Sequence, residues 1–219
     1  MAVLRRLPVL LLCPVIMGLA QLSWEDGFLA RLELLALIET LNADLLSHSS
    51  ATLTLERWCA DHGLAKTGKV VAELDRGAEK KLDDRDRERL ALAAHDRLRY
   101  RHVRLFCGEK LLSEADNWYV ENRLSQDMNR LLDETDTPFG RAVSGLNFRR
   151  ETISAELLWR PLPEHWELSP AIPPSLGARF EAPSRILEHR AILRTDLNVP
   201  FSYVVETYTS DVIAFPLPK

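Results

Sequence analysis

Cysteine, glycine and net charge are all scarce in this sequence. Its 219 residues include three cysteines and nine glycines. Hydrophobic residues make up 46% of the chain and charged residues 27%, which is an ordinary balance for a globular protein. Collagen-like, low-complexity and mostly disordered chains are therefore excluded. The length suits one large domain or two small ones.

The chain also lacks a positive net charge. Its 28 basic and 32 acidic residues give a formal charge of −4. Non-specific binding of nucleic acid depends on a basic surface that neutralises phosphates. We therefore expect no nucleic-acid partner.

Several signatures of catalysis are missing as well. The sequence has no glycine-rich phosphate loop, no G-x-S-x-G nucleophile motif, and no paired-cysteine or HExxH metal motif. The six histidines are scattered and suggest no ligand set. We therefore expect a mechanism without metal or cofactor, or no catalysis.

The first 20 residues have the plan of a secretory signal peptide. Arg5 and Arg6 precede an apolar stretch over residues 7–17, and small residues lead to Ala20. The stretch is short for a membrane span and contains two prolines, so we expect cleavage after Ala20 and no stable membrane anchor. A buried N-terminal helix of a cytosolic protein is the alternative. The predicted mature chain, residues 21–219, is expected in the bacterial periplasm.

Export changes how the cysteines are interpreted. Cys13 lies inside the predicted signal, which leaves Cys59 and Cys107 in the mature chain. Disulfides persist in exported proteins, so these two can form a bridge. The sequence does not show that they meet, and two buried thiols are the alternative.

Hydrophobic spacing predicts an α+β fold with helices first and antiparallel strands after them. The pattern predicts helices from Ser23 to about Leu46, from Ser50 to Gly63, and over 125–134. It predicts strands at 69–74, 98–107, 111–120, 148–159, 185–194 and 201–209, with two hairpins among them. A proline-rich connection over 161–183 is a potential boundary, but the hairpin after it is too small to fold alone. We therefore predict one domain.

Strand alternation places two charges on apolar faces. Arg101 falls on the same side of its strand as Val103 and Leu105, and Glu206 shares its side with Val204. A charge on such a face must be paired, hydrogen-bonded or reserved for a ligand. The two side chains therefore line one cavity, or they form a salt bridge with each other or reach water at the sheet rim.

Short motifs in a fixed order resemble the chorismate pyruvate-lyase family, which makes 4-hydroxybenzoate from chorismate. They lie at 50–52, 100–119, 137–141, 149–150 and 206–208. Each motif is weak alone, and the specificity comes from their order and spacing. Ligand-binding domains of some transcriptional regulators share this fold, so the fold alone does not establish catalysis.

The resemblance, which covers roughly residues 30–209, implies a six-stranded antiparallel sheet with the ligand enclosed under helical flaps. The positions that it assigns to ligand binding are Arg101, Glu206, the backbone amide of Phe139, the flap residue Ala51, and Arg150, whose role is less defined. The family often carries a larger apolar residue at the flap position, so enclosure of the ligand differs where this chain has Ala51.

The family chemistry is a cofactor-free elimination of pyruvate from chorismate. Arg101 would hold a carboxylate, since a guanidinium binds carboxylates with defined geometry, and Glu206 would protonate the leaving oxygen. Chorismate is a cytosolic metabolite, however, and export would separate this protein from it. The alternative is an exported, non-catalytic binding protein for a small aromatic or other carboxylate. In both cases we expect a monomer with a small-molecule ligand.

Overall fold

The structure, a computed structural model, describes residues 20–168 and 179–215. The predicted signal lies outside the described residues, except for Ala20. The helices are α1 (Phe28–Ser47), α2 (Ala51–Asp61), α3 (Asp84–Arg89), α4 (Gln126–Glu134) and α5 (Phe139–Ala142). The strands are β1 (Ala20–Glu25), β2 (Val70–Asp75), β3 (Leu98–Cys107), β4 (Lys110–Val120), β5 (Arg149–Leu157), β6 (Arg179–Ala182), β7 (Arg185–Arg194) and β8 (Pro200–Thr209).

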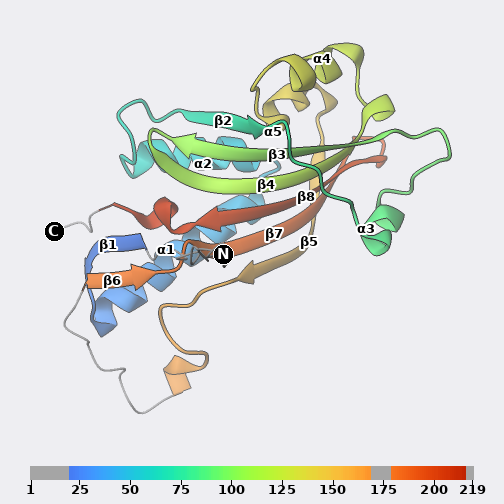
Figure 1. The fold of residues 1–219 in the computed structure, drawn as a ribbon. Helices are drawn as coiled ribbons and strands as arrows, with labels where there is room; N and C mark the ends of the chain where they lie inside the picture. Colours follow the sequence, from blue (N-terminus) through green and yellow to red (C-terminus); the bar gives the residue numbers. More distant parts are fainter. Residues whose placement is uncertain (1–19, 169–178, 216–219) are drawn as a thin grey trace, which may run out of the picture.

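Six strands form one antiparallel sheet in the order β2-β3-β4-β8-β7-β5 (Figure 1). The predicted fold class, a single α+β domain on a six-stranded antiparallel sheet, is confirmed. The central strands β4 and β8 join the two predicted hairpins, β3–β4 and β7–β8. This pairing places the two halves of the chain side by side on one surface.

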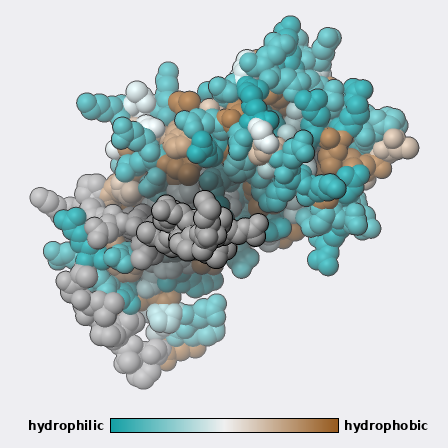
Figure 2. All heavy atoms as spheres, viewed as in Figure 1, coloured by the Kyte–Doolittle hydropathy of each residue, from teal (hydrophilic) through white to brown (hydrophobic). Residues whose placement is uncertain are grey.

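The two faces of the sheet are covered differently. Helices α1 and α2 lie behind the sheet in Figure 1, and their buried residues pack on the β3 side chains Val103 and Leu105. The opposite face is covered by the segment between β2 and β3, where Leu82 and Leu90 pack with Trp118 of β4. In the view of Figure 2 the surface is mostly hydrophilic, with hydrophobic residues in scattered groups. Among the described residues, no helix combines the length and apolarity that a membrane span requires.

Local sequence signals set several boundaries where they were predicted. The Ser50 hydroxyl caps α2 by accepting a hydrogen bond from the backbone N–H of Leu53. Gly63 follows α2 with a φ of +59°, a left-handed conformation that glycine adopts readily. The β3–β4 turn is tighter than predicted, because β4 already begins at Lys110.

The predicted start of the first helix at Ser23 is wrong. Residues 20–25 form β1, which pairs with β6, and α1 begins only at Phe28 after an extended Gly27. The Trp24 side chain is buried, and its indole N–H donates to the carbonyl of Phe215 at 2.7 Å. A partner strand more than 150 residues away therefore overrides the local helical pattern.

The same pairing shows what the proline-rich connection does. The last described part of this connection is β6, which pairs with the first strand, β1. The connection therefore belongs to the same domain and does not mark a boundary between two domains. Residues 169–178 of this segment lie outside the described residues.

A disulfide joins Cys59 of α2 to Cys107 at the end of β3, with a Cα–Cα distance of 6.3 Å. It fixes α2 to the sheet near its C-terminal end.

Candidate functional site

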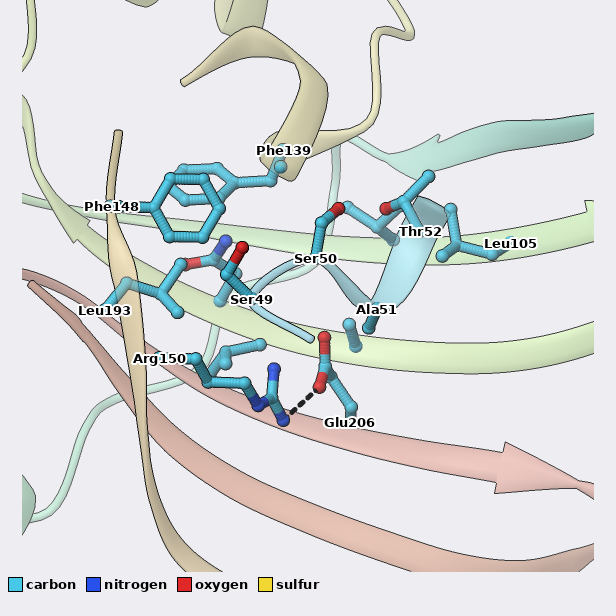
Figure 3. A pocket seen from close by; sticks show the side chains of 15 residues that line it. Ser49, Ser50, Ala51, Thr52, Leu105, Phe139, Phe148, Arg150, Leu193 and Glu206 are labelled. Atoms are coloured by element: carbon cyan, nitrogen blue, oxygen red, sulfur yellow. Dashed lines mark hydrogen bonds and ion pairs between the residues drawn. The ribbon is translucent and has the colours of Figure 1, made fainter. Parts of the chain in front are cut away.

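A pocket lies between the sheet and the start of α2 (Figure 3). Its floor is the sheet face on which the sequence placed the two charges. The strands contribute Val103, Leu105, Ala115, Asn117, Arg150, Leu193, Val204 and Glu206. The cover consists of Ser49, Ser50, Ala51 and Thr52 from the α1–α2 connection and the first turn of α2, with Phe139 and Phe148 at one side (Figure 3). Gly140, which follows Phe139 in the chain, also lines the pocket.

Arg150 and Glu206 form a buried ion pair in this pocket. Arg150 Nη2 donates to Glu206 Oε2 at 2.6 Å, and only 4% of the Arg150 side chain and 13% of the Glu206 side chain are exposed. The Tyr208 hydroxyl donates to the same Oε2 at 3.1 Å. Burial raises the pKa of Tyr208, so its phenol stays protonated and remains a donor. Burial would lower the pKa of Arg150, but the Glu206 carboxylate outweighs it and the pKa is raised.

The two oxygens of Glu206 have different surroundings. Oε2 carries both hydrogen bonds, whereas Oε1 has no hydrogen-bond partner among the described residues and points toward the cover of the pocket near Ala51 (Figure 3). The Nε of Arg150 is buried without a partner within the described part of the chain. The pocket therefore presents a free acceptor oxygen beside a buried guanidinium.

The N-terminal end of α2 supplies backbone donors. Ala51 and Thr52 are its first two residues, and the first amides of a helix have no acceptor inside it. The helix dipole adds partial positive charge at this end. The segment from Thr137 to Gly140, here called the strap, lies against this end of α2. A Cβ added at Gly140 would lie only 2.9 Å from Ser50 Oγ. Glu56 of α2 also forms an ion pair with Arg141 of α5 at 2.5 Å.

Arg101 lies just beyond this pocket. It is 7% exposed and sits directly across from Asn117, which lines the pocket. Its Nη2 donates to the Thr137 carbonyl at 3.4 Å, and its Nε and Nη1 are buried with no partner in the described residues. Burial lowers the pKa of Arg101. Its side chain lines a neighbouring hollow of about 400 Å³ between β3 and α4, not the pocket itself.

His189 extends the buried polar group under the pocket. It lies on β7, is fully buried, and is paired directly with Glu206 of the neighbouring strand β8. Its Nε2 lies 2.8 Å from Asn42 Oδ1 of α1, and its Nδ1 has no partner among the residues described. Burial lowers the pKa of His189 to about 4; the nearby Glu206 carboxylate opposes this shift, and the Arg150 charge adds to it. The imidazole is therefore neutral at neutral pH.

Four of the five predicted site residues meet at one pocket. The pocket is lined by Ala51, Phe139, Arg150 and Glu206. Arg101 lies outside it and contacts the strap at the Thr137 carbonyl. Glu206 pairs with Arg150 and not with Arg101. Sequence reasoning did not select Asn117, Phe148 or Leu193. Strand alternation marks Asn117 as polar on an apolar face and was the available signal for it.

The pocket is small, with a cavity volume of about 50 Å³. A cavity of about 150 Å³ holds benzene in a well-studied case. An aromatic ligand therefore requires outward movement of the cover or of the two phenylalanine rings. Within the described ranges, no group of three or more His, Cys, Asp or Glu side chains is arranged to hold a metal ion.

Comparison with known proteins gives one relative over most of the chain. The uncharacterized protein y4mC of Sinorhizobium fredii is 48% identical over 200 residues, which cover 91% of this chain and 84% of y4mC. No family model matches the sequence.

Solved structures resemble the fold at lower similarity. PhnF from Mycobacterium smegmatis has a TM-score of 0.46 at 11% identity, over 78% of this chain and 68% of PhnF. A GntR-family transcriptional regulator from Enterococcus faecalis has a TM-score of 0.40 at 15% identity, over 68% of this chain and 99% of the regulator.

Proposed function

The chain belongs to the family of the Sinorhizobium fredii protein y4mC, and we propose that it binds a small aromatic carboxylate in the pocket under α2. The proposal rests on the three buried charged side chains on this face of the sheet, of which two are basic and one is acidic. Arg150 and Glu206 neutralise each other, whereas Arg101 is buried and forms no ion pair with an acidic side chain among the described residues, with Asp133 and Asp136 acting on its charge only at longer range. An unpaired buried cation is costly, and an anionic ligand would provide its counter-charge.

The ligand carboxylate would lie at the Arg101 end of the pocket. The contact from Arg101 to the Thr137 carbonyl is long for a hydrogen bond, so a carboxylate can replace it at little cost. Phe139 begins α5 directly after Pro138, which leaves its backbone amide as a second donor at this end. The apolar strand side chains and the Phe148 ring would hold the body of the ligand.

The experiment is a thermal-shift and calorimetric titration of the purified protein with benzoate, 4-hydroxybenzoate and short aliphatic carboxylates. Saturation at a hundred times Kd should stabilise the protein by about 2.7 kcal/mol. Arg101→Met should abolish this gain, while the same change at the half-exposed Arg99 should preserve it. The absence of a shift with every acid of the panel would reject the proposal.

Chorismate pyruvate-lyase activity is the second candidate. It is favoured by the free Oε1 of Glu206, which faces the pocket where a leaving oxygen would lie. In this reaction the ether C–O bond breaks, the leaving oxygen takes a proton from Glu206 in its protonated form, and the ring proton released on aromatisation goes to water, from which Glu206 is protonated again. The protein should then release pyruvate from chorismate, and Glu206→Gln should stop the release while benzoate binding persists. Pyruvate release at the uncatalysed rate would leave the binding function alone.

We also propose that the protein is exported and that residues 1–20 are removed. The disulfide between Cys59 and Cys107 supports an oxidising compartment. Amino-terminal sequencing of the protein from its host should begin at Gln21. A protein in the cytosolic fraction that still starts at Met1 would contradict export.

A further inference from the structure

We propose that β2 is the edge at which two copies of this chain associate, each β2 pairing antiparallel with β2 of the other copy. β2 is an outer strand of the six-stranded sheet and lies at its upper border in Figure 1. One side of the strand pairs with β3, and no described strand pairs with its other side. Residues of β2 do not line the ligand pocket, so the association does not depend on what the pocket binds. A dimer replaces the monomer expected from the sequence.

The two outer strands of this sheet differ in their protection against a further strand. β5 has a register shift against β7 between Thr152 and Ser154, and such a bulge keeps an edge from pairing with another chain. β2 pairs with β3 without a shift over its whole length, and it contains neither proline nor lysine. The Val71 side chain on β2 is 60% exposed. The edge at β2 is therefore regular and open to a further strand.

The charges along this edge are complementary to those of a second copy. In a two-fold antiparallel pairing centred on Ala72, Lys69 lies opposite the partner's Asp75, and Asp75 lies opposite the partner's Lys69. Both side chains are exposed. Asp75 Oδ1 accepts a hydrogen bond from the Gly77 backbone N–H at 3.0 Å, which holds the carboxylate at the end of the strand. Opposite charges directly across two strands stabilise the pairing, so the second copy fits this edge twice over.

The apolar residues of β2 support the same pairing. Val70 and Ala72 are buried on the helix side of the sheet, and Leu74 on that side is only partly buried. In the pairing centred on Ala72, Leu74 lies opposite the partner's Val70, which covers its exposed part. Residues opposite each other in neighbouring strands carry their side chains on the same face. The two six-stranded sheets would therefore join into one, with both α2 helices on the same side of it.

The experiment is sedimentation velocity of the purified full protein at neutral pH. A contact along one short strand is small, so we expect a reversible dimer with a Kd on the order of 10–100 µM. Lys69→Glu should weaken this dimer at least tenfold, because two pairs of like charges then face each other. The matched control is Lys81→Glu, at an exposed lysine on the segment between β2 and β3, and it should leave the Kd within twofold.

A charge exchange tests the register of the pairing. Lys69→Glu and Asp75→Lys should each associate poorly alone, but an equimolar mixture should form a heterodimer, because both ion pairs are then restored. An unchanged melting temperature in dilute solution shows that each variant is folded. Where Asp75→Lys does not fold, Val71→Glu replaces it and should weaken the dimer at least tenfold, since it faces the partner's Glu73.

Three outcomes would overturn the proposal. The first is a folded wild-type protein that stays monomeric up to about 500 µM, well above the expected Kd. The second is a dimer that neither Lys69→Glu nor Val71→Glu weakens, which would place the contact elsewhere on the surface. The third is a mixture of folded Lys69→Glu and Asp75→Lys that associates no better than either variant alone.

Discussion

His189 offers a test of the buried polar group through the pH dependence of stability. The imidazole is fully buried between α1 and the sheet, with Nε2 against Asn42 and Nδ1 without a partner among the described residues. Burial lowers its pKa to about 4 from the usual 6.5, against the opposing effect of the Glu206 carboxylate and with a smaller contribution from the Arg150 charge. Replacement by glutamine removes the titration and keeps a side chain that can donate to Asn42.

The sign follows from where the proton binds. Above pH 6.5 the imidazole is neutral in both the folded and the unfolded chain, so its contribution to stability is fully present. As the pH falls below 6.5, the His189 imidazole of the unfolded chain binds a proton, whereas in the folded protein it binds one only near pH 4. The free energy of unfolding therefore falls through this window, by about 2 kcal/mol at pH 5 and about 3 kcal/mol at full effect.

The assay is urea unfolding of the wild type and of His189→Gln at pH 8, 6 and 5. Between pH 8 and pH 5 the wild type should lose about 2 kcal/mol more than the variant. All other titrating groups are shared and largely cancel in the difference. Parallel pH profiles for the two proteins would show that His189 is not held neutral by burial, and the account of the group under the pocket would fail.

Three further perturbations test the packing around the pocket. Arg101→Met should stabilise the ligand-free protein by about 1–2 kcal/mol in urea unfolding, because it removes a buried charge that forms no ion pair among the described residues; a destabilised variant would show that Asp133 and Asp136 compensate this charge. Gly140→Ala should lower the free energy of unfolding by about 1–2 kcal/mol, because the added Cβ presses on Ser50 Oγ. Ser50→Ala should lower it by about 1 kcal/mol, because the α2 cap is lost. The double variant should lose less than the sum of the two, and strict additivity would argue against the contact. Replacement of both Cys59 and Cys107 by alanine should lower the free energy of unfolding by about 4 kcal/mol, given their separation of 48 residues, and a loss below about 1 kcal/mol would contradict the cross-link.

Local patterns predicted those elements whose hydrogen bonds are made locally. Both hairpins follow from alternation around short turns, and the start of α2 follows from a capping serine at Ser50. The first strand could not be predicted in this way. Trp24 fits a helical pattern as well as a buried strand, and only β6, far away in the sequence, decides between them.

The site shows the same division between local and distant information. Alternation placed Arg101 and Glu206 each on the apolar side of its own strand, because side-chain direction within a strand is a local property. It did not reveal that Glu206 pairs with Arg150, since that contact depends on the register of β5 on β7 and of β7 on β8. The family resemblance singled out Arg150, but its role became definable only from the contact with Glu206 Oε2.

The covalent and ionic ties of α2 limit how an aromatic ligand can enter a pocket of about 50 Å³. The disulfide at Cys59 fixes α2 to β3, and the Glu56–Arg141 ion pair fixes it to α5. Of the strands in the floor, β3, β4, β7 and β8 are paired on both sides, and the edge strand β5 is paired with β7. The parts left to move are the α1–α2 connection at residues 48–50 and the rings of Phe139 and Phe148. Ligand entry should therefore depend on the Ser50–Gly140 contact, which closes the connection against the strap, and not on displacement of the helix.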